Sequence, residues 1–241
     1  MSGMKIGGMP VTAIRVGTQS VQAVRAGTDL LWSRTTLRDT FDRADTLDLS
    51  AGGGLWADQG PSSDFFAGIV NGTCRLNVPD NIASWGLNLR TSRKCFTGGT
   101  LVGDFQGYVE ARIASMGNSG SSMAPAYITQ VFAKVSDGVF TNGIGFQLDS
   151  STLRLVRRVS SADTVIASYG AFALGDVIRL SWLGDVYTLW RNGSLLDPWT
   201  DSGSTVVTGA GSRSMGIRVD AAKEVFGARK FSPALDYVEM G

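Results

Sequence analysis

The sequence predicts an all-β fold in which two antiparallel sheets pack face to face as a jelly-roll sandwich, after a short N-terminal β-repeat. Candidate strands and turn residues alternate along the 241 residues at the spacing expected of such a domain. Gly, Ser, Thr and Asp are abundant, whereas only Glu110, Glu224 and Glu239 are Glu, and this composition favours turns over helices. Residues 220–230 offer one short helical candidate, which Gly227 weakens.

Residues 1–34 contain a ten-residue repeat, PVTAIRVGTQ at residues 10–19 and SVQAVRAGTD at residues 20–29. Each unit reads as a short alternating strand that ends in a Gly-Thr corner, and Leu30-Leu31-Trp32 begins a third strand of this short meander. So small a ribbon is marginal in water, so we expect it to dock on another chain or on a second copy of itself. The alternative is a strand pair of the main domain. The apolar residues expected to carry the assembly are Val11, Ile14, Val16, Val21, Val24, Leu31 and Trp32.

Residues 35–241 are predicted to form the sandwich. Asn-Gly pairs favour tight hairpins because both turn residues need positive φ, and they occur at residues 71–72, 142–143 and 192–193. Within residues 176–183, Ile178, Leu180 and Trp182 share one face of an alternating strand, so that face is predicted to be core. Further strands are expected at residues 65–70, 73–78, 107–115, 126–135, 152–159, 187–191, 194–196, 214–220 and 233–240.

Several functional classes are excluded or disfavoured by composition. The chain has no His, which removes Ser-His-Asp and Cys-His catalysis and His-ligated zinc. Its net charge of +1 disfavours nucleic acid as a partner. The first ten residues lack the apolar run of a signal peptide, and no later segment approaches the about 20 apolar residues of a membrane span. We therefore expect a protein made in a cytoplasm, without membrane insertion, that reaches the exterior by another route such as assembly into a particle.

Neither cysteines nor acidic clusters indicate a metal or cofactor. Cys74 and Cys95 are too few for a disulfide framework or a four-thiolate zinc site, and either two buried thiols or one bridge between neighbouring strands fits the pattern. Asp39, Asp42 and Asp45 offer hard oxygens, but their spacing does not match an EF-hand calcium loop. We assign them capping and turn roles, with a calcium site as the alternative, and we predict no metal and no cofactor.

Acidic pairs and aromatic residues are the remaining chemical signals. A jelly-roll glucanase typically carries its acids on one strand as Glu-x-Asp-x-x-Glu, and that motif is absent here, so the chain is predicted not to be an enzyme. Sugar rings stack on aromatic faces, which makes aromatic residues candidates for glycan binding. We expect Trp56 and Trp182 to be core, and the glycan-binding candidates are Trp85, Tyr108 and Trp199.

The paired repeat, ending in Leu-Leu-Trp32, resembles the start of minor tail proteins from long-tailed (siphovirus-type) phages of actinobacteria. The segment DTFDRADT at residues 39–46, Trp56, and GDVIRLSWLGDVYTLWRNGSLLDPWTDS at residues 175–202 are similar to the concanavalin-like or laminin-G-like sandwich of those proteins. Together they span most of the chain. The resemblance implies a virion component at the tail tip or on a tail fibre, in contact with other tail proteins and with the host envelope. A homotrimer is what the habits of that family imply.

These observations favour a non-enzymatic phage tail protein. Residues 1–34 would attach it to the particle or to sister subunits, and residues 35–241 would present loops to a host-envelope glycan. Several copies are expected, because multivalent display converts weak sites into lasting attachment. The alternatives are a purely structural or decorating virion protein without a ligand, and a cell-wall glycoside hydrolase. An exposed aromatic groove would favour glycan binding, a closed core that buries every Trp would favour decoration, and two facing carboxylates in a cleft would favour the hydrolase.

Overall fold

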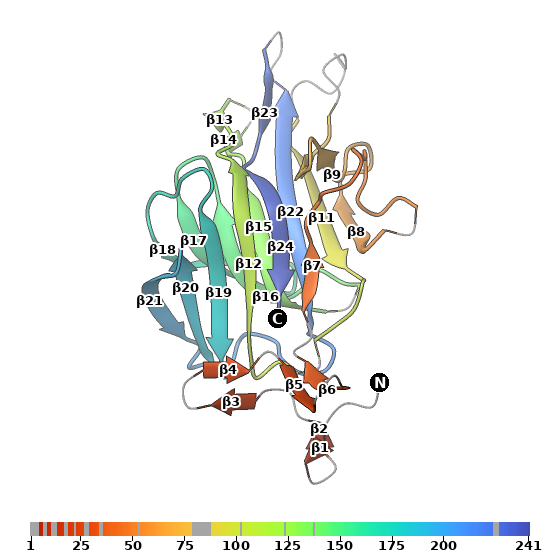
Figure 1. Cartoon of the computed structure of the whole chain (residues 1–241). Coiled ribbons are helices and arrows are strands. Elements are labelled where there is room, and N and C mark those ends of the chain that lie inside the picture. Colours follow the sequence, from red (N-terminus) through yellow and green to blue (C-terminus); the bar gives the residue numbers. More distant parts are fainter. Residues whose placement is uncertain are drawn as a thin grey trace.

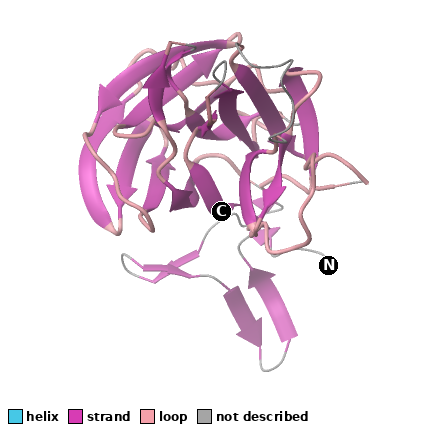
Figure 2. Ribbon diagram, turned by 90° about the horizontal axis from the view of Figure 1, so that it is seen from above, coloured by secondary structure: helices cyan, strands magenta, loops and turns pink. Residues whose placement is uncertain are grey.

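The computed structural model describes residues 36–52, 54–78, 88–101, 103–122, 124–136, 138–223 and 227–241 in full, and within residues 5–33 the backbone of six short strands. The main body is a sandwich of two eight-stranded antiparallel sheets, which confirms the predicted fold class (Figures 1 and 2). The described residues form no helix, so none among them is long and apolar enough to cross a membrane.

The first sheet, sheet I, contains the first and last strands of the sandwich. Its strands are β7 (Leu37–Asp39), β9 (Ala67–Val70), β10 (Thr73–Leu76), β12 (Gln106–Ser115), β19 (Val177–Leu183), β20 (Val186–Arg191), β21 (Ser194–Thr200) and β24 (Ala234–Met240). They follow the order β21-β20-β19-β12-β24-β10-β9, and β7 also pairs with β24. The C-terminal strand therefore lies near the middle of sheet I.

The second sheet, sheet II, is built mostly from the central part of the chain. Its strands are β8 (Trp56–Pro61), β11 (Arg90–Phe96), β15 (Thr129–Val135), β16 (Gly143–Leu148), β17 (Leu153–Val159), β18 (Ala162–Ser168), β22 (Ser214–Lys223) and β23 (Arg229–Phe231). They follow the order β18-β17-β16-β15-β22-β11-β8, and β23 pairs with β22. A separate hairpin joins β13 (Ser119–Ser121) to β14 (Ala124–Ala126).

The main core lies between the two sheets. On β19, Ile178, Leu180 and Trp182 are all buried, as the alternation predicts. Ile217 of β22 belongs to the same buried cluster from the side of sheet II, and Trp56 is buried too, as predicted. Burying a large apolar side chain contributes about 1.5–3 kcal/mol, so these layers hold the sheets together and leave their outer faces for other contacts.

Two of the three predicted Asn-Gly hairpins are confirmed. Asn71-Gly72 joins β9 to β10 and Asn192-Gly193 joins β20 to β21, with both residues of each pair at positive φ. The prediction is wrong for Asn142-Gly143, because a longer loop links β15 to β16 and Asn142 is not at positive φ. The Asn142 side chain instead accepts a hydrogen bond from the Ser160 amide at 3.0 Å, which ties this loop to the end of β17.

The N-terminal strands form three separate hairpins, which Figure 1 shows beneath one end of the sandwich. The pairs are β1 (Lys5–Ile6) with β2 (Met9–Pro10), β3 (Ile14–Val16) with β4 (Gln19–Val21), and β5 (Ala23–Ala26) with β6 (Asp29–Ser33). In the second and third hairpins the two residues between the strands are the Gly-Thr corners of the repeat. One residue separates β4 from β5, too few for a hairpin loop, so the segment is not the continuous meander that we expected.

The predicted assembly role of this segment stays a prediction. Val11 lies outside the described residues, and so do the side chains of Ile14, Val16, Val21, Val24, Leu31 and Trp32. Their backbone pairing is consistent with a β-ribbon, and it does not indicate which surface the ribbon covers.

The cysteines are two buried, free thiols rather than a bridge. Cys74 lies in the core between the sheets, where burial raises the pKa of its thiol. Cys95 belongs to a different buried cluster, which rules out the single bridge that the sequence left open.

Asp39 and Asp45 take the turn roles that we assigned to them. Asp39 accepts hydrogen bonds from the Phe41 amide at 2.8 Å and from Nε1 of Trp56 at 2.7 Å. The Asn71 amide donates to Asp45 at 2.8 Å. These carboxylates therefore fix the loop that enters the sandwich.

Candidate functional site

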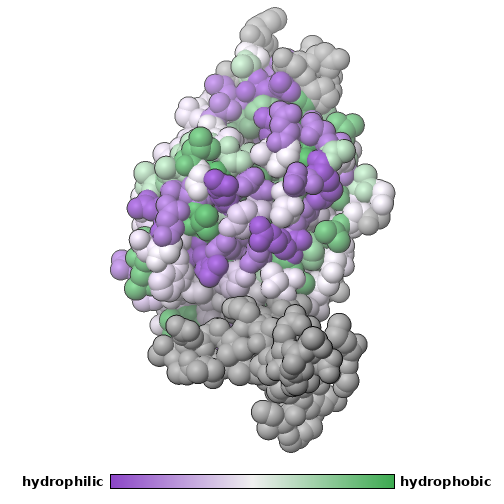
Figure 3. Space-filling model, in the orientation of Figure 1, coloured by the Kyte–Doolittle hydropathy of each residue, from purple (hydrophilic) through white to green (hydrophobic). Residues whose placement is uncertain are grey.

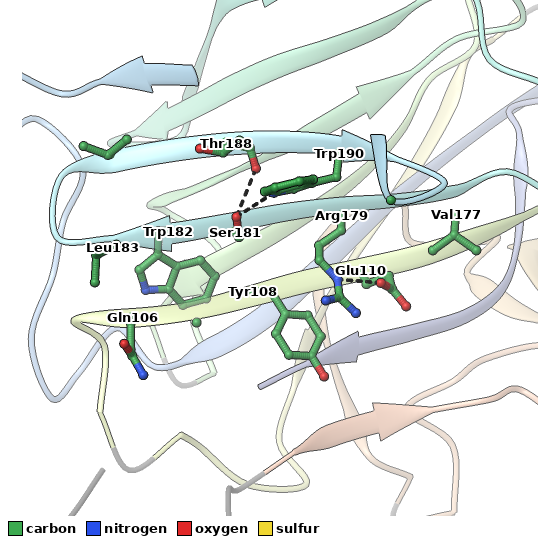
Figure 4. A pocket seen from close by; sticks show the side chains of 13 residues that line it. Gln106, Tyr108, Glu110, Val177, Arg179, Ser181, Trp182, Leu183, Thr188 and Trp190 are labelled. Carbon is green, nitrogen blue, oxygen red and sulfur yellow. Dashed lines mark hydrogen bonds and ion pairs between the residues drawn. The ribbon is translucent and has the colours of Figure 1, made fainter. Parts of the chain in front are cut away.

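A groove lies on the outer face of sheet I, where β12, β19 and β20 run side by side (Figure 4). Its volume of about 810 Å³ is within the range of ligand pockets. Side chains alternate along a strand, so the residues between the core positions line the groove. They include Tyr108, Glu110, Arg179, Ser181, Thr188 and Trp190.

Gly107 shapes one end of this groove. A Cβ at this position would lie 2.5 Å from Cζ2 of Trp182, so only glycine lets the indole pack this closely against β12. Nε1 of Trp182 donates to the Asp104 carbonyl at 2.9 Å, which fixes the ring. Trp182 is thus a core residue, as predicted, and it also lines the groove.

A row of charged side chains crosses sheet I at the groove. Direct cross-strand pairing aligns Arg38, Glu239, Glu110, Arg179 and Trp190 on β7, β24, β12, β19 and β20. Two Glu residues therefore lie directly opposite each other, which is destabilising unless their charges are compensated. Arg38 pairs with Glu239 at 2.7 Å and Arg179 pairs with Glu110 at 2.6 Å. Each carboxylate thus has its own arginine.

Two tyrosine hydroxyls complete this network from diagonal positions. Tyr237 donates to Oε1 of Glu110 at 2.5 Å, and Tyr108 donates to Oε1 of Glu239. Burial raises the pKa of Tyr237, and its hydrogen bond to the Glu110 carboxylate raises it further. Each carboxylate therefore accepts hydrogen bonds from one arginine and one tyrosine.

Beside these charges the groove presents two partly exposed aromatic rings. The guanidinium carbon of Arg179 lies 4.2 Å from the centroid of the Tyr108 ring, and Nε1 of Trp190 donates to Oγ of Ser181 at 2.8 Å. Figure 4 shows Arg179 between the two rings. Fixed aromatic faces next to hydroxyl, guanidinium and carboxylate groups are the chemistry that binds a sugar ring by stacking and by oriented hydrogen bonds.

The three glycan-binding candidates from the sequence lie in different places. Tyr108 lines the groove. Trp199 does not line it, and its ring packs against Tyr187 with centroids 5.6 Å apart. Trp85 lies outside the described residues. Sequence reasoning missed Trp190, although its position after the core residue Leu189 places it on the outer face of β20.

The described surface gives little sign of other ligand chemistry on this side. The face in Figure 3 has hydrophilic and apolar residues interspersed, without a broad apolar patch among the coloured residues. Within the described ranges, no group of three or more Cys, Asp or Glu side chains is arranged to hold a metal ion. The groove in sheet I therefore remains the site with the most specific chemistry on this face.

Comparison with known proteins establishes the fold class. No family model matches the sequence, and no curated protein matches it. Among solved structures, a prokaryotic β-1,3-1,4-glucanase (lichenase) from a mouse hindgut metagenome is 12% identical with a TM-score of 0.55, over 86% of this chain and 98% of that one. The endo-β-1,3(4)-glucanase SCLam of family GH16 is 12% identical with a TM-score of 0.51, over 85% and 89%. The Crh5 transglycosylase is 11% identical with a TM-score of 0.52, over 85% and 83%. The chain thus has a concanavalin-like β-sandwich fold.

Proposed function

We propose that this protein is a non-enzymatic glycan-binding protein, and that a short stretch of a sugar chain binds in the groove of sheet I. The observation that carries this proposal is the pair of partly exposed rings, Tyr108 and Trp190, on either side of Arg179. Apolar faces of sugar rings would stack on the aromatic rings, while Arg179, Ser181 and Thr188 would bind hydroxyl groups. The sequence criterion of an exposed aromatic groove favours this role over decoration without a ligand.

The biological setting that we propose is the tail of a phage, at its tip or on a fibre. The support is the resemblance of the N-terminal repeat and sandwich to minor tail proteins, together with the hairpin ribbon that precedes the sandwich. In this setting residues 1–34 would attach the protein to other tail proteins or to sister copies in a homo-oligomer, a trimer by that resemblance. The ligand would be a glycan of the host envelope. Two of the compared structures are named as β-glucanases, which agrees with carbohydrate as the ligand class but is an analogy of fold alone.

The test is binding of the full chain to a panel of envelope polysaccharides and soluble β-glucans. We expect Trp190→Ala and Tyr108→Ala each to weaken binding at least about tenfold, because each removes a stacking surface. Val165→Ala is the control, since Val165 is 51% exposed on β18 of the other sheet. Binding that both aromatic variants retain would disprove the groove as the site, and binding to no member of the panel would favour the decorating role.

The facing carboxylates favour one second candidate, a glycoside hydrolase. Glu110 and Glu239 are direct cross-strand partners, although only Glu110 lines the groove. Each carboxylate is already paired with an arginine and accepts a hydrogen bond from a tyrosine, whereas the two acids of a glycosidase flank the scissile bond. We therefore expect no reducing ends to be released from any bound polysaccharide. Release that Glu110→Gln abolishes would establish the hydrolase instead.

A further inference from the structure

A row of polar side chains crosses the outer face of sheet II, on the opposite side of the sandwich from the groove. Direct pairing aligns Arg93, Arg218, Gln130, Gln147 and Arg154 on β11, β22, β15, β16 and β17. Arg93 and Arg218 are therefore direct cross-strand neighbours, an arrangement in which like charges repel. Neither residue is fully buried, so this part of the row is accessible from solvent.

The charges around this row do not balance at Arg93. Arg218 binds Asp220 through two hydrogen bonds of 3.0 and 2.9 Å. Arg158, four residues beyond Arg154 on β17, binds Asp163 at 2.5 Å. Arg93 forms no hydrogen bond or ion pair with the residues that the structure describes, and its Nε is buried without a partner. Burial lowers the pKa of Arg93, and the positive charges of Arg158 and Arg218 lower it further, against a smaller opposing effect of the Asp163 and Asp220 carboxylates.

A second unpaired polar atom lies in the same row. Gln130 is 0% exposed and its amide donates to Gln147 at 2.9 Å and to Asp163 at 3.2 Å. Its carbonyl oxygen, Oε1, is buried without a donor. An unpaired buried polar atom lowers the stability of a fold, so such atoms are rare in native proteins. The row thus lacks one acceptor, at Arg93, and one donor, at Gln130.

We propose that Arg93, with Arg218, forms a second binding site, for the anionic groups of a polymer. A carboxylate or phosphate would accept from the Arg93 guanidinium and relieve its repulsion with Arg218. This site is independent of the proposed groove, because it lies on the other sheet and shares no residue with it.

The experiment measures binding of the full chain to three polymers at one fixed ionic strength, so that screening is the same throughout. The probes are polygalacturonate for carboxylate, poly(glycerol phosphate) for phosphate, and a neutral β-glucan. We expect one or both anionic polymers to bind, and Arg93→Gln to weaken that binding about tenfold or more. Arg90→Gln is the matched control, because Arg90 is on the same strand, carries the same charge and pairs with Asp64 away from the row. It should change the affinity less than about twofold.

Thermal unfolding separates a site from a purely structural role. Without polymer, Arg93→Gln should unfold about 1–2 °C higher than the wild type, because it removes a like-charge pair. A polymer that binds should raise the unfolding temperature of the wild type but not of Arg93→Gln. Trp190→Ala should leave anion binding unchanged, so failure of this site and failure of the groove are distinguishable. The proposal is overturned if neither anionic polymer binds, or if Arg93→Gln and Arg90→Gln bind equally well.

Discussion

The outer faces of the two sheets differ in how they treat their polar residues. On sheet I the arginines of the charged row are exposed, and Arg179, whose side chain is 43% exposed, pairs with Glu110 beside the aromatic rings. On sheet II the loop after β15 folds over the face and brings Phe140 against Phe132, with ring centroids 5.3 Å apart. A Cβ on Gly216 would lie 2.8 Å from the Phe140 ring, so a glycine is needed beneath it.

The difference shows that a sandwich of this kind can have a second, smaller core outside its main one. The cluster on sheet II consists of Cys95, Phe132, Val135, Phe140 and Val156, all buried. Polar residues beside this cluster are buried as well, so we expect their substitution to lower the stability of the fold. Among the described residues no comparable apolar cluster covers the outer face of sheet I, so we expect its exposed arginines to be replaced at lower cost in stability. We therefore expect substitutions in the buried cluster of sheet II to affect folding, and those in the groove of sheet I to affect binding.

The largest contrast should come from the aromatic residues. Phe140→Ala should lower the free energy of unfolding by about 3–4 kcal/mol, because it opens a cavity in the cluster on sheet II. Tyr108→Ala on sheet I should cost only about 1 kcal/mol, since its ring is partly exposed. Urea unfolding followed by tryptophan fluorescence measures both. Equal losses would contradict the distinction between a covered and an open face.

The next contrast compares a buried arginine on sheet II, Arg158, with an exposed arginine on sheet I, Arg179. Arg158 is 3% exposed, and it donates to the Phe140 carbonyl at 2.9 Å and to Asp163 at 2.5 Å. Arg158→Met should therefore destabilise the fold by about 2–3 kcal/mol, because it leaves buried acceptors unpaired. Arg179→Met should cost less than about 1 kcal/mol, as expected of an exposed ion pair. The same urea experiment applies, and a larger loss for Arg179→Met would reverse the assignment of the two faces.

A smaller effect is expected when the pH is lowered, and it involves Asp149 at the end of sheet II. Burial tends to raise the pKa of Asp149, but hydrogen bonds from Arg154 and from the Ser151 and Thr152 amides outweigh it and hold that pKa below its ordinary value. This stabilisation is present above the unfolded pKa of about 3.9 and is lost as pH falls through the folded pKa. Asp149→Asn should cost about 1 kcal/mol at pH 7 and progressively less below about pH 4. Stability curves of both proteins between neutral and acid pH test this, and a constant difference would refute it.

The smallest effect is expected when the pH is raised, and it involves Tyr237 on sheet I. Because the pKa of Tyr237 is raised, its contribution is present below the unfolded pKa of about 10 and is lost as pH rises through the folded pKa. Tyr237→Phe should change stability by less than about 1 kcal/mol at pH 7. Above about pH 10 its stability should decline less steeply than that of the wild type. Tyrosinate absorbance during titration checks the assignment, since the variant should lack one late-titrating tyrosine.

The sequence predicts the main sandwich better than it predicts the outer faces. The alternation of apolar and polar residues correctly places Ile178, Leu180 and Trp182 in the core, because every second side chain of a strand with one buried face points into the core. Strand β11 escapes prediction, because its polar Lys94 is fully buried. Lys94 pairs with Asp48 at 2.6 Å and Asp58 at 2.9 Å, and those partners are 46 and 36 residues away in the chain. Contacts of this range leave no local pattern.

The candidate site is predictable in its chemistry but only partly in its residues. The aromatic residue type leads to the proposed ligand class and to Tyr108, because both follow from side-chain type and strand parity. Trp190 could have been found by extending the same parity from Leu189. The sequence alone could not have shown that Glu110 and Glu239 are direct cross-strand partners, because this depends on the pairing of strands more than a hundred residues apart. Strand order, rather than propensity, sets which charges meet on an outer face.

The N-terminal hairpins are offset from the repeat that encodes them. The second and third hairpins each have a Gly-Thr corner between their strands, so the first strand comes from one ten-residue unit and most of the second strand from the residues that follow that unit. Duplication or loss of one whole unit would therefore add or remove one complete hairpin and leave the pairing of the others intact. A segment of this kind can change its length in discrete steps during evolution, whereas the insertion of a single residue would shift every side chain beyond it to the opposite face of its strand.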